Sequence, residues 1–309
     1  MARRRKGTPI HGWLIIDKPA GATSARIVAK VRAITGAAKL GHGGTLDPLA
    51  TGVLPIALGE ATKTVAYVMD GAKRYRFVVR WGEERDTDDI DGSVTATSPD
   101  RPDDAAIRAA LAAFRGEILQ APPAYSAVKI AGRRAYDLAR ARADVRPEAR
   151  RVRIDSFDLV GQLDADHAEF EVSCGKGAYM RALARDLGRA LGTGACIARL
   201  RRTAVGPFAE KDAISLAELE SLGHIAALAH RLIPVEAALD DIPALAVTEI
   251  QAGYLRQGRP VRLPGAAGHG AYAGPPAEPE AVLATLGGKP VALVRRTGGE
   301  IRPVRVLNL

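Results

Sequence analysis

Cysteine is almost absent from this 309-residue chain, which holds only Cys174 and Cys196 and no CxxC pair. A secreted disulfide scaffold needs more cysteines, and a zinc site needs clustered ligands. The six histidines are scattered and form no HExxH or similar spacing. We therefore predict two reduced, buried thiols in a cytoplasmic protein that holds no metal ion.

Long apolar runs are missing as well. The run 53–58 is interrupted by Pro55, and the stretch 225–247 contains three acidic residues, so no segment is predicted to span a bilayer. Residues 1–6 carry three arginines and a lysine but lead into Gly-Thr-Pro and not into an apolar segment. We expect neither a signal peptide nor a transit peptide there, and we interpret residues 1–8 as a flexible basic tail.

Charge and apolar content are present in the amounts typical of a folded protein. The chain is 47% hydrophobic and 26% charged, which excludes a disordered polymer. Its net charge is +9, with 34 arginines and 10 lysines. Arginine suits bidentate recognition of phosphate and stacking on bases, but genomic coding bias explains the excess equally well. The composition therefore allows, without requiring, a nucleic acid or other acidic partner.

Hydrophobic periodicity predicts strands and helices that do not alternate as βαβ units. Expected strands lie at 13–16, 75–81, 150–160 and 167–173, and expected helices follow Thr23 or Ser24 and cover 102–114 and 179–191. This order predicts an α+β fold and not a parallel doubly wound sheet.

The pattern changes after Pro234. A short helix near 248–257 and strands at 281–286, 290–295 and 301–307 are expected, separated by a loop at 264–280 with four prolines and four glycines. We predict a large domain at 9–238 and a small, separate β-rich domain at 242–309.

One loop, residues 41–52, carries a lone carboxylate between glycines. Its sequence GHGGTLDPLATG lacks the Lys-Ser/Thr pair of a phosphate-binding loop, and Leu46 stands where a GxGxxG motif needs glycine. An oriented, partly desolvated carboxylate such as Asp47 can act as a nucleophile or a base. An Asp-Pro pair that merely begins a turn is the alternative interpretation.

A family resemblance extends this motif. The string GHGGTLDPLATGVLP at 41–55 resembles the catalytic motif of the tRNA pseudouridine-55 synthases, the TruB family. Further segments resemble that family in the same order, over roughly residues 10–235: LIIDKP (14–19), KRYR (73–76), AYSAVK (124–129), CGKGAYMR (174–181) and LRR (200–202). Gly43 replaces a threonine and Gly175 a serine often seen there, and the tail is a shorter version of the family's C-terminal RNA-binding domain.

The resemblance implies a catalytic role for three residues. Asp47 is the expected nucleophile, which lets uracil detach from its ribose and reattach through carbon. Tyr75 is expected to stack on the uracil and serve in proton transfer, although a strand tyrosine also suits a core. Arg181 is expected to pair with Asp47 and hold it ionised, although an arginine at a helix start is commonly solvated.

The resemblance also implies five substrate-binding residues. Tyr179 and Leu200 are expected as apolar walls of the pocket, and His42 as a residue that holds displaced nucleotides. Lys18 is expected near the site, and Asp89 is expected to meet a polar or basic group beside the pocket. Without the resemblance, ordinary core, turn and surface positions explain these residues.

The RNA backbone is expected to follow basic residues. The resemblance and the charge together select Arg201, Arg202, Lys63 and Lys129 for RNA binding, and arginine-rich runs at 140–153, 199–202 and 295–305 as a phosphate track. A solvated surface is the alternative for each run taken alone.

The resemblance implies a catalytic domain with a central mixed, mainly antiparallel sheet flanked by helices, and a small β-rich PUA-like domain. The implied activity converts uridine 55 in the TΨC arm of tRNA to pseudouridine by flipping the base out of its stack. No cofactor, no protein partner and a monomeric state are expected. A guide-dependent relative that acts on ribosomal RNA, and an RNA-folding aid, are the alternatives.

Overall fold

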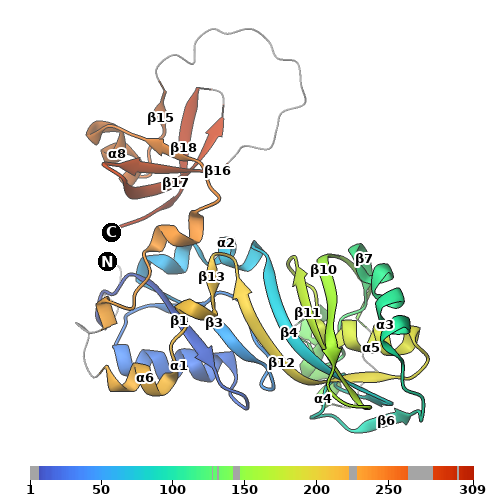
Figure 1. The fold of residues 1–309 in the computed structure, drawn as a ribbon. Helices are drawn as coiled ribbons and strands as arrows, with labels where there is room; N and C mark the ends of the chain where they lie inside the picture. Colours follow the sequence, from blue (N-terminus) through green and yellow to red (C-terminus); the bar gives the residue numbers. More distant parts are fainter. Residues whose placement is uncertain are drawn as a thin grey trace, which may run out of the picture.

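The computed structural model describes residues 7–126, 128–130, 132–141, 147–222, 228–263, 281–297 and 299–309. The predicted tail at 1–8 lies almost wholly outside them, and the predicted loop at 264–280 lies entirely outside them. Two sheets of unequal size organise the described chain (Figure 1). No helix among the described residues is long and apolar enough to cross a membrane.

The larger sheet has nine strands in the order β1-β3-β12-β4-β11-β10-β7, with β2 beside β3 and β13 beside β12. Its strands are β1 (Gly12–Lys18), β2 (Leu40–His42), β3 (Thr51–Leu58), β4 (Lys73–Trp81), β7 (Gly116–Gln120), β10 (Arg150–Gln162), β11 (His167–Cys174), β12 (Ala195–Val205) and β13 (Phe208–Ala209). β12 pairs with β3 in parallel, and the other pairings are antiparallel. The expected mixed, mainly antiparallel sheet is confirmed.

Helices cover the two ends of this sheet. Figure 1 shows α1 and α6 beside β1 and β3, and α3 and α5 beside β10 and β7. The α-helices that precede the second sheet are α1 (Ser24–Thr35), α2 (Val65–Asp70), α3 (Asp104–Leu111), α4 (Ala135–Arg140), α5 (Met180–Ala190) and α6 (Leu216–Ser221). Short 3₁₀ turns are η1 (Gly59–Lys63), η2 (Ala112–Phe114), η3 (Glu210–Asp212) and η4 (Val235–Leu239).

The caps of α1 show why its sequence forms a helix there. The Thr23 hydroxyl accepts a hydrogen bond from the Arg26 amide, and Gly36 ends the helix in the left-handed region at φ 62°. Ile27 and Val31 are buried, so one face of the helix enters the core. The predicted start after Thr23 is confirmed.

The core lies between these helices and the inner face of the sheet. Phe157 and Phe170 have ring centroids 5.4 Å apart, and Phe77 stacks on Phe170 at 5.7 Å. Aromatic pairs at such distances add to the stabilisation from buried area. Burial along β11 alternates, with Ala168 and Phe170 inward, as the period of two predicts.

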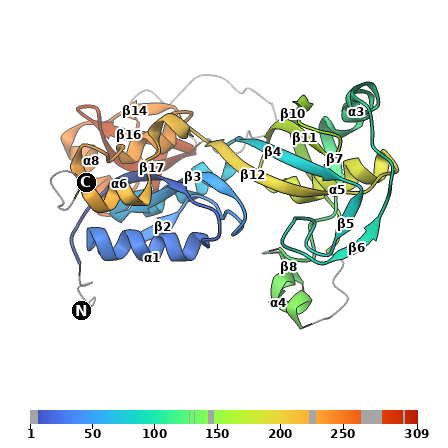
Figure 2. The ribbon, with the colours of Figure 1, turned by 60° about the horizontal axis from the view of Figure 1, so that its bottom comes forward.

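Two hairpins extend from the main body. β5 (Glu83–Arg85) pairs with β6 (Val94–Thr97), and β8 (Lys129–Ile130) pairs with β9 (Arg133–Arg134). Figure 2 shows α4 and β8 projecting away from the large sheet. The turn between β5 and β6 returns to the sheet, because the Ile197 amide donates to the Asp88 carbonyl.

The second sheet has five strands in the order β14-β16-β17-β18-β15. They are β14 (Ala244–Ala246), β15 (Val261–Arg262), β16 (Ala281–Leu286), β17 (Lys289–Thr297) and β18 (Glu300–Val306), and α8 (Glu249–Arg256) packs on them. The β-rich C-terminal fold is therefore confirmed.

The second sheet packs against the first through a shared hydrophobic cluster. Leu283, Leu293 and Leu307 belong to the same hydrophobic cluster as Trp13 and Val53 of the large sheet. Two polar contacts reinforce this interface: Lys63 Nζ donates to the Val306 carbonyl at 2.7 Å, and the Asn308 amide donates to Glu60 Oε2 at 2.8 Å. Apolar contact with the first sheet adds to the second sheet's own cluster of buried residues.

Candidate active site

Asp47 lies in the loop between β2 and β3, and its backbone is held firmly. The Ser24 hydroxyl accepts from the Leu46 amide at 2.8 Å and donates to the Leu46 carbonyl at 3.0 Å. The Pro48 carbonyl accepts from the Gly21 amide at 2.8 Å. The Asp47 side chain itself remains 36% exposed. The loop therefore presents a fixed carboxylate that a reactant can reach.

Gly52 allows the loop to return into β3. Its φ is 97°, in the left-handed region, and a Cβ there would lie 2.2 Å from the Arg202 carbonyl oxygen. Glycine is therefore required where β3 begins to pair with β12.

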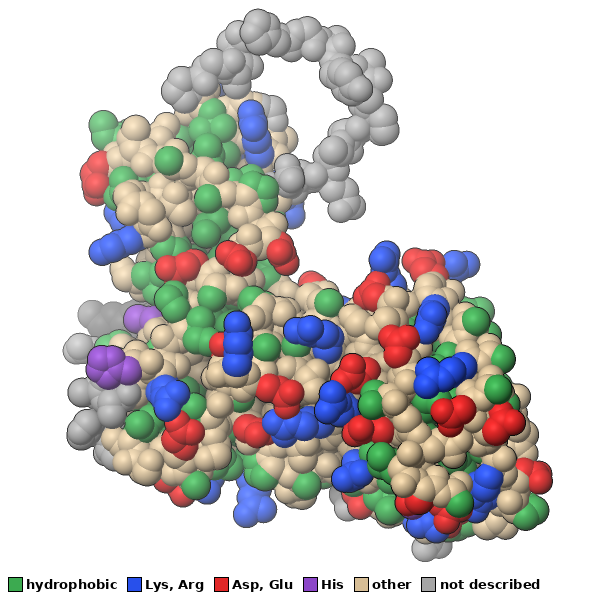
Figure 3. Space-filling model, in the orientation of Figure 1, with side chains coloured by type: hydrophobic (Ala, Val, Ile, Leu, Met, Phe, Trp, Pro, Cys, Tyr) green, Lys and Arg blue, Asp and Glu red, His purple; other side chains and the backbone are tan. Residues whose placement is uncertain are grey.

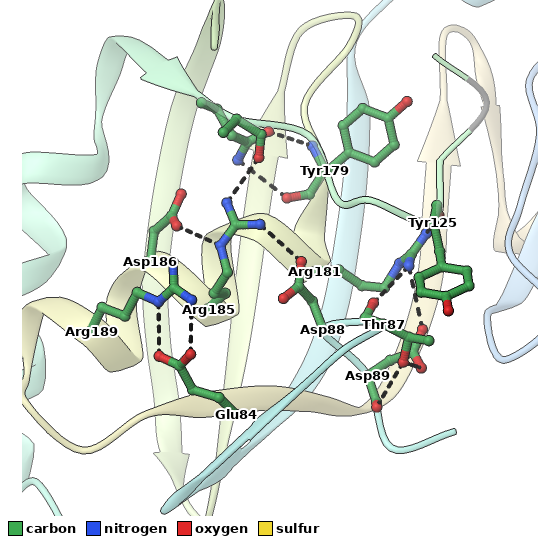
Figure 4. Close-up of polar contacts among 12 residues, drawn as sticks. Glu84, Thr87, Asp88, Asp89, Tyr125, Tyr179, Arg181, Arg185, Asp186 and Arg189 are labelled. Carbon is green, nitrogen blue, oxygen red and sulfur yellow. Dashed lines mark hydrogen bonds and ion pairs between the residues drawn. The ribbon is translucent and has the colours of Figure 1, made fainter. Parts of the chain in front are cut away.

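Arg181 brings Asp47 together with a second segment of the chain. Arg181 Nε donates to Asp47 Oδ2 at 2.9 Å, Nη1 donates to the Thr87 carbonyl at 2.8 Å, and Nη2 donates to the Tyr125 carbonyl at 2.8 Å. Figure 4 shows the guanidinium between Thr87, Asp89 and Tyr125. Its side chain is 5% exposed. The expected pairing of Arg181 with Asp47 is confirmed, and its catalytic role stays a prediction.

Asp89 completes the surroundings of Arg181. Its Oδ2 lies 3.6 Å from Arg181 Nη1, and its Oδ1 accepts from the Thr87 hydroxyl at 2.6 Å. Burial raises the pKa of Asp89, while the Thr87 hydrogen bond and the Arg181 charge oppose that shift. Asp89 thus meets a basic group beside the pocket as expected, and its role in substrate binding stays a prediction.

A pocket of about 330 Å³ lies beside Asp47. The predicted residues Asp47, Tyr75, Tyr179 and Leu200 all line it, and so does Arg202. The lining also includes Lys73, Arg150 and Lys176, which lie in the quoted motifs and arginine runs, and Met69, which the sequence analysis did not mark. A carboxylate at the edge of a half-apolar pocket that contains two tyrosines suits a planar, polar ring such as a nucleobase.

The position of Tyr179 depends on a residue that the sequence analysis missed. Gln120 Oε1 accepts from the Tyr179 amide at 2.8 Å, and Gln120 Nε2 donates to the Tyr179 carbonyl at 3.2 Å. The Arg150 guanidinium lies 5.5 Å from the centre of the Tyr179 ring. Nothing local in the sequence marks Gln120, because its partner is 59 residues away.

Tyr75 and Arg202 are opposite each other on β4 and β12. The Arg202 guanidinium interacts electrostatically with the Tyr75 phenol. The surrounding protein raises the pKa of the Tyr75 phenol, and the Arg202 charge partly opposes that shift. The phenol is therefore neutral at pH 7, and its proton can be donated to a bound molecule.

Arg202, which is expected to bind RNA, is buried beside the pocket, and its role in RNA binding stays a prediction. Arg202 is 1% exposed, and its guanidinium donates to the Val53 carbonyl at 2.9 Å and the Gly44 carbonyl at 3.1 Å. Alternation along β12 turns Arg202 into the pocket side, where it holds the loop that carries Asp47.

The other predicted RNA-binding residues have partners inside the protein or lie outside the description. Arg201 pairs with Asp17 at 2.9 Å and with Glu210, and Lys63 donates to Glu60 at 2.6 Å as well as to Val306. Their role in RNA binding stays a prediction. The Lys129 side chain lies outside the described part of the chain. Figure 3 shows basic and acidic side chains interspersed on the visible face, so no unbroken basic stripe crosses it.

Lys18 lies near the site in a buried position. It is 0% exposed, and its Nζ donates to the Pro19 and Pro48 carbonyls at 2.9 and 3.2 Å. Burial lowers the pKa of Lys18 to about 8, opposed by the charge of Asp47 and reinforced by that of Arg202. The expected proximity to Asp47 is therefore confirmed, and the ammonium also fixes the backbone of Pro48.

His42 lies apart from the lining of this pocket. It is on β2, and its Nδ1 is buried without a hydrogen-bond partner among the described residues. Burial and the charge of Arg202 lower the pKa of His42, so the ring is neutral at pH 7. Its contact with displaced nucleotides stays a prediction.

Comparisons with known proteins agree on one family. Residues 32–180 match the model of the TruB family pseudouridylate synthase (N terminal domain), and residues 181–240 match that of the tRNA pseudouridylate synthase B C-terminal domain. The tRNA pseudouridine synthase B of Rhodospirillum rubrum is 56% identical over 309 residues, which is 100% of both chains. That of Caulobacter vibrioides is 50% identical, again over 100% of both.

The fold has solved counterparts too. A chain in the crystal structure of a Cbf5-Nop10-Gar1 complex superposes with a TM-score of 0.73 at 25% identity, covering 99% of this chain and 91% of that one. The sheet order, the Asp47 loop and the full-length sequence relatives lead to one assignment. The chain belongs to the TruB family of pseudouridylate synthases.

Proposed function

We propose that this chain converts the uridine at position 55 in the T arm of tRNA to pseudouridine. As a member of the TruB family, it isomerises uridine to pseudouridine in tRNA. The observation that carries the chemistry is the pair of Asp47 and Arg181 at the edge of the pocket. The T arm as the site of modification, a monomeric state and a role in RNA binding for residues 242–309 belong to the same proposal.

The reaction exchanges one bond for another without a net redox change. The bond between ribose C1′ and uracil N1 breaks, a bond between C1′ and C5 forms, C5 loses its proton and N1 gains one. The target base must first leave its stack, at a cost of a few kcal/mol that stacking in the protein offsets. Tyr75, Tyr179 and Leu200 provide the walls for that contact.

Asp47 is the group placed to start the exchange. Arg181 holds Oδ2, so the carboxylate is aimed and Oδ1 is left for the substrate. Asp47 then acts as nucleophile or base, and the Tyr75 phenol, which lines the same pocket, takes part in proton transfer. The charges of Arg202 and Lys18 stabilise negative charge that develops around the loop.

A guide-dependent enzyme of ribosomal RNA receives less support. The Cbf5 chain in the solved complex is 25% identical to this chain, whereas the bacterial tRNA enzyme is 56% identical over the full length. We infer that the chain acts on tRNA without a guide or a protein partner.

A purified-component assay tests the proposal. The chain alone, incubated with a tRNA transcript, should form pseudouridine at position 55, and a transcript with cytidine at that position should stay unmodified. Asp47→Asn should abolish product while tRNA affinity stays within about tenfold, because the carboxylate touches the reacting atoms and not the phosphates. Pseudouridine from the Asp47→Asn protein would contradict the assignment of the nucleophile.

A further inference from the structure

Helix α5 contacts one segment of the chain repeatedly with three arginines. Arg181, Arg185 and Arg189 are spaced four residues apart, so they lie on one face of the helix. All three donate to the segment 84–89, which joins β5 to the Arg181 site (Figure 4). The middle contact, between Arg185 and Asp88, is not used by the mechanism described above.

The Arg185 side chain is 12% exposed and joins three parts of the chain. Nη1 donates to Asp88 Oδ2 at 2.9 Å, Nη2 donates to the Ala121 carbonyl at 2.8 Å, and Nε donates to Asp186 Oδ1 at 2.8 Å. Such a planar fork fixes the relative position of its acceptors in a way that a single ammonium cannot.

Asp88 has an unusual backbone. It is the sole non-glycine residue of the described chain with a positive φ, at 60°, and its side chain is 11% exposed. A non-glycine residue stays in that region only when its surroundings hold it there, and such residues cluster at functional sites. Here the holding contacts are Arg185 on the side chain and the Ile197 amide on the carbonyl.

We propose that the ion pair of Asp88 and Arg185 is a positioning device for the isomerisation, which orients Arg181 and through it Asp47. Asp88 stands between Thr87 and Asp89, whose carbonyl and carboxylate meet Arg181 Nη1. Arg185 also holds Ala121, which leads to the Tyr125 carbonyl that accepts from Arg181 Nη2. The pair thus fixes both segments that hold the Arg181 guanidinium.

Neither residue lines the pocket or touches Asp47, so both are positioning residues. The inference rests on the proposed function. A displacement of a reacting group by about 1 Å can cost about a hundredfold in rate, so a loosened Arg181 should slow the chemical step. Binding of tRNA should change little, because both side chains are mostly buried and neither lines the pocket.

The pair also predicts a pH dependence. Burial raises the pKa of Asp88 to about 6, opposed by the charges of Arg185, Arg181 and Arg189, which face it from α5. As pH falls through about 6, Asp88 becomes protonated and the ion pair is lost. The rate of the wild-type protein should fall across that pH, whereas Asp88→Asn should show no such step.

The test measures single-turnover pseudouridine formation and tRNA affinity on the full-length protein. Asp88→Asn keeps the shape and tolerates positive φ, and Asp88→Gly keeps the backbone freedom but removes the side chain. Arg185→Lys keeps the charge but loses the fork. Each should slow the step by about tenfold or more, with the dissociation constant for tRNA within about twofold.

A matched control and a double variant separate positioning from general stability. Arg189→Gln removes the ion pair with Glu84 on the same helix face, and its half-exposed arginine should leave the rate unchanged. If the pair acts through Arg181, Asp88→Asn should slow the Arg181→Lys protein by less than it slows the wild type.

The outcomes are distinct. A fall in rate for the Asp88 and Arg185 variants, with that coupling to Arg181, supports the proposal. If the wild type is active and the Asp88 and Arg185 variants keep its rate, the positioning proposal is wrong while the proposed function stands. The same holds if Asp88→Asn slows the wild type and the Arg181→Lys protein equally. A wild type that forms no pseudouridine overturns the proposed function and this inference with it.

Discussion

Two arginines flank the Asp47 loop from opposite sides, and the protein surrounds them differently. On the α5 side, Arg181 meets the carboxylates of Asp47 and Asp89. On the β12 side, Arg202 meets the carbonyls of Val53 and Gly44 and the phenol of Tyr75, and no carboxylate of the described chain lies within 4.0 Å of its guanidinium.

This difference in partners gives the two arginines different roles: Arg181 orients Asp47, and Arg202 provides positive electrostatic potential. Carboxylates neutralise Arg181, so its main effect is to aim Asp47. The charge of Arg202 is less compensated, and after the larger effect of burial it further lowers the pKa of both Lys18 and His42. The β12 side therefore supplies a positive potential, which favours an anion or developing negative charge in the pocket.

Arg181→Lys should have the largest effect on activity. The ammonium keeps the charge but cannot bond Asp47, Thr87 and Tyr125 at once, so the single-turnover rate should fall by about 10²–10³. Quenched single-turnover assays measure it. A rate within about twofold of wild type would show that charge, and not orientation, is what the α5 side provides.

Arg202→Met should lower the free energy of unfolding more than a substitution of the more exposed Arg201. The variant would leave three acceptors of Arg202 buried without a donor. This penalty is larger than the gain from no longer burying a charged guanidinium, so the free energy of unfolding should fall by about 2 kcal/mol. Urea denaturation measures the loss. Equal stability of the variant and the wild type would mean that Arg202 serves electrostatics alone.

Lys18→Met should change the pH dependence of stability. Burial lowers the folded-state pKa of Lys18 from 10.5 to about 8, so the unfolded chain binds the proton more strongly between those values. The unfolding free energy of the wild type, relative to Lys18→Met, should therefore rise between pH 8 and 10.5, by at most about 1.4 kcal/mol per pH unit. Parallel denaturation curves over this range would contradict the burial of a charged Lys18.

Arg201→Gln should have the smallest effect. Its pairs with Asp17 and Glu210 are more than a third exposed, and such pairs contribute about 0–1 kcal/mol. The melting temperature should change by a few degrees at most, while tRNA affinity reports whether Arg201 also contacts phosphate. A large loss of stability would remove the contrast between Arg201 and Arg202.

Local patterns predicted the elements that depend on near neighbours. Thr23 and Gly36 mark the ends of α1, and alternation in β11 places Phe170 in the core. The family motif placed Asp47, Tyr75 and Arg181 together. Sequence alone could not reveal contacts such as Arg185 with Asp88, which are 97 residues apart, or a charged side chain that strand alternation directs inward.

Consecutive residues of β12 lie in opposite environments. Arg201 lies on the outer face among acidic side chains, whereas Arg202 faces the pocket, and Leu200 shares that inner side. The deletion of one residue from β12 before Arg201 would move each arginine to the opposite face of the strand, unless a bulge absorbed the shift. Arg202 would then move to the outer face and leave the Asp47 loop unsupported, and Arg201 would turn inward at the place of Leu200. Length in this strand is therefore as strictly limited as composition, and insertions are expected to accumulate in the flanking turns.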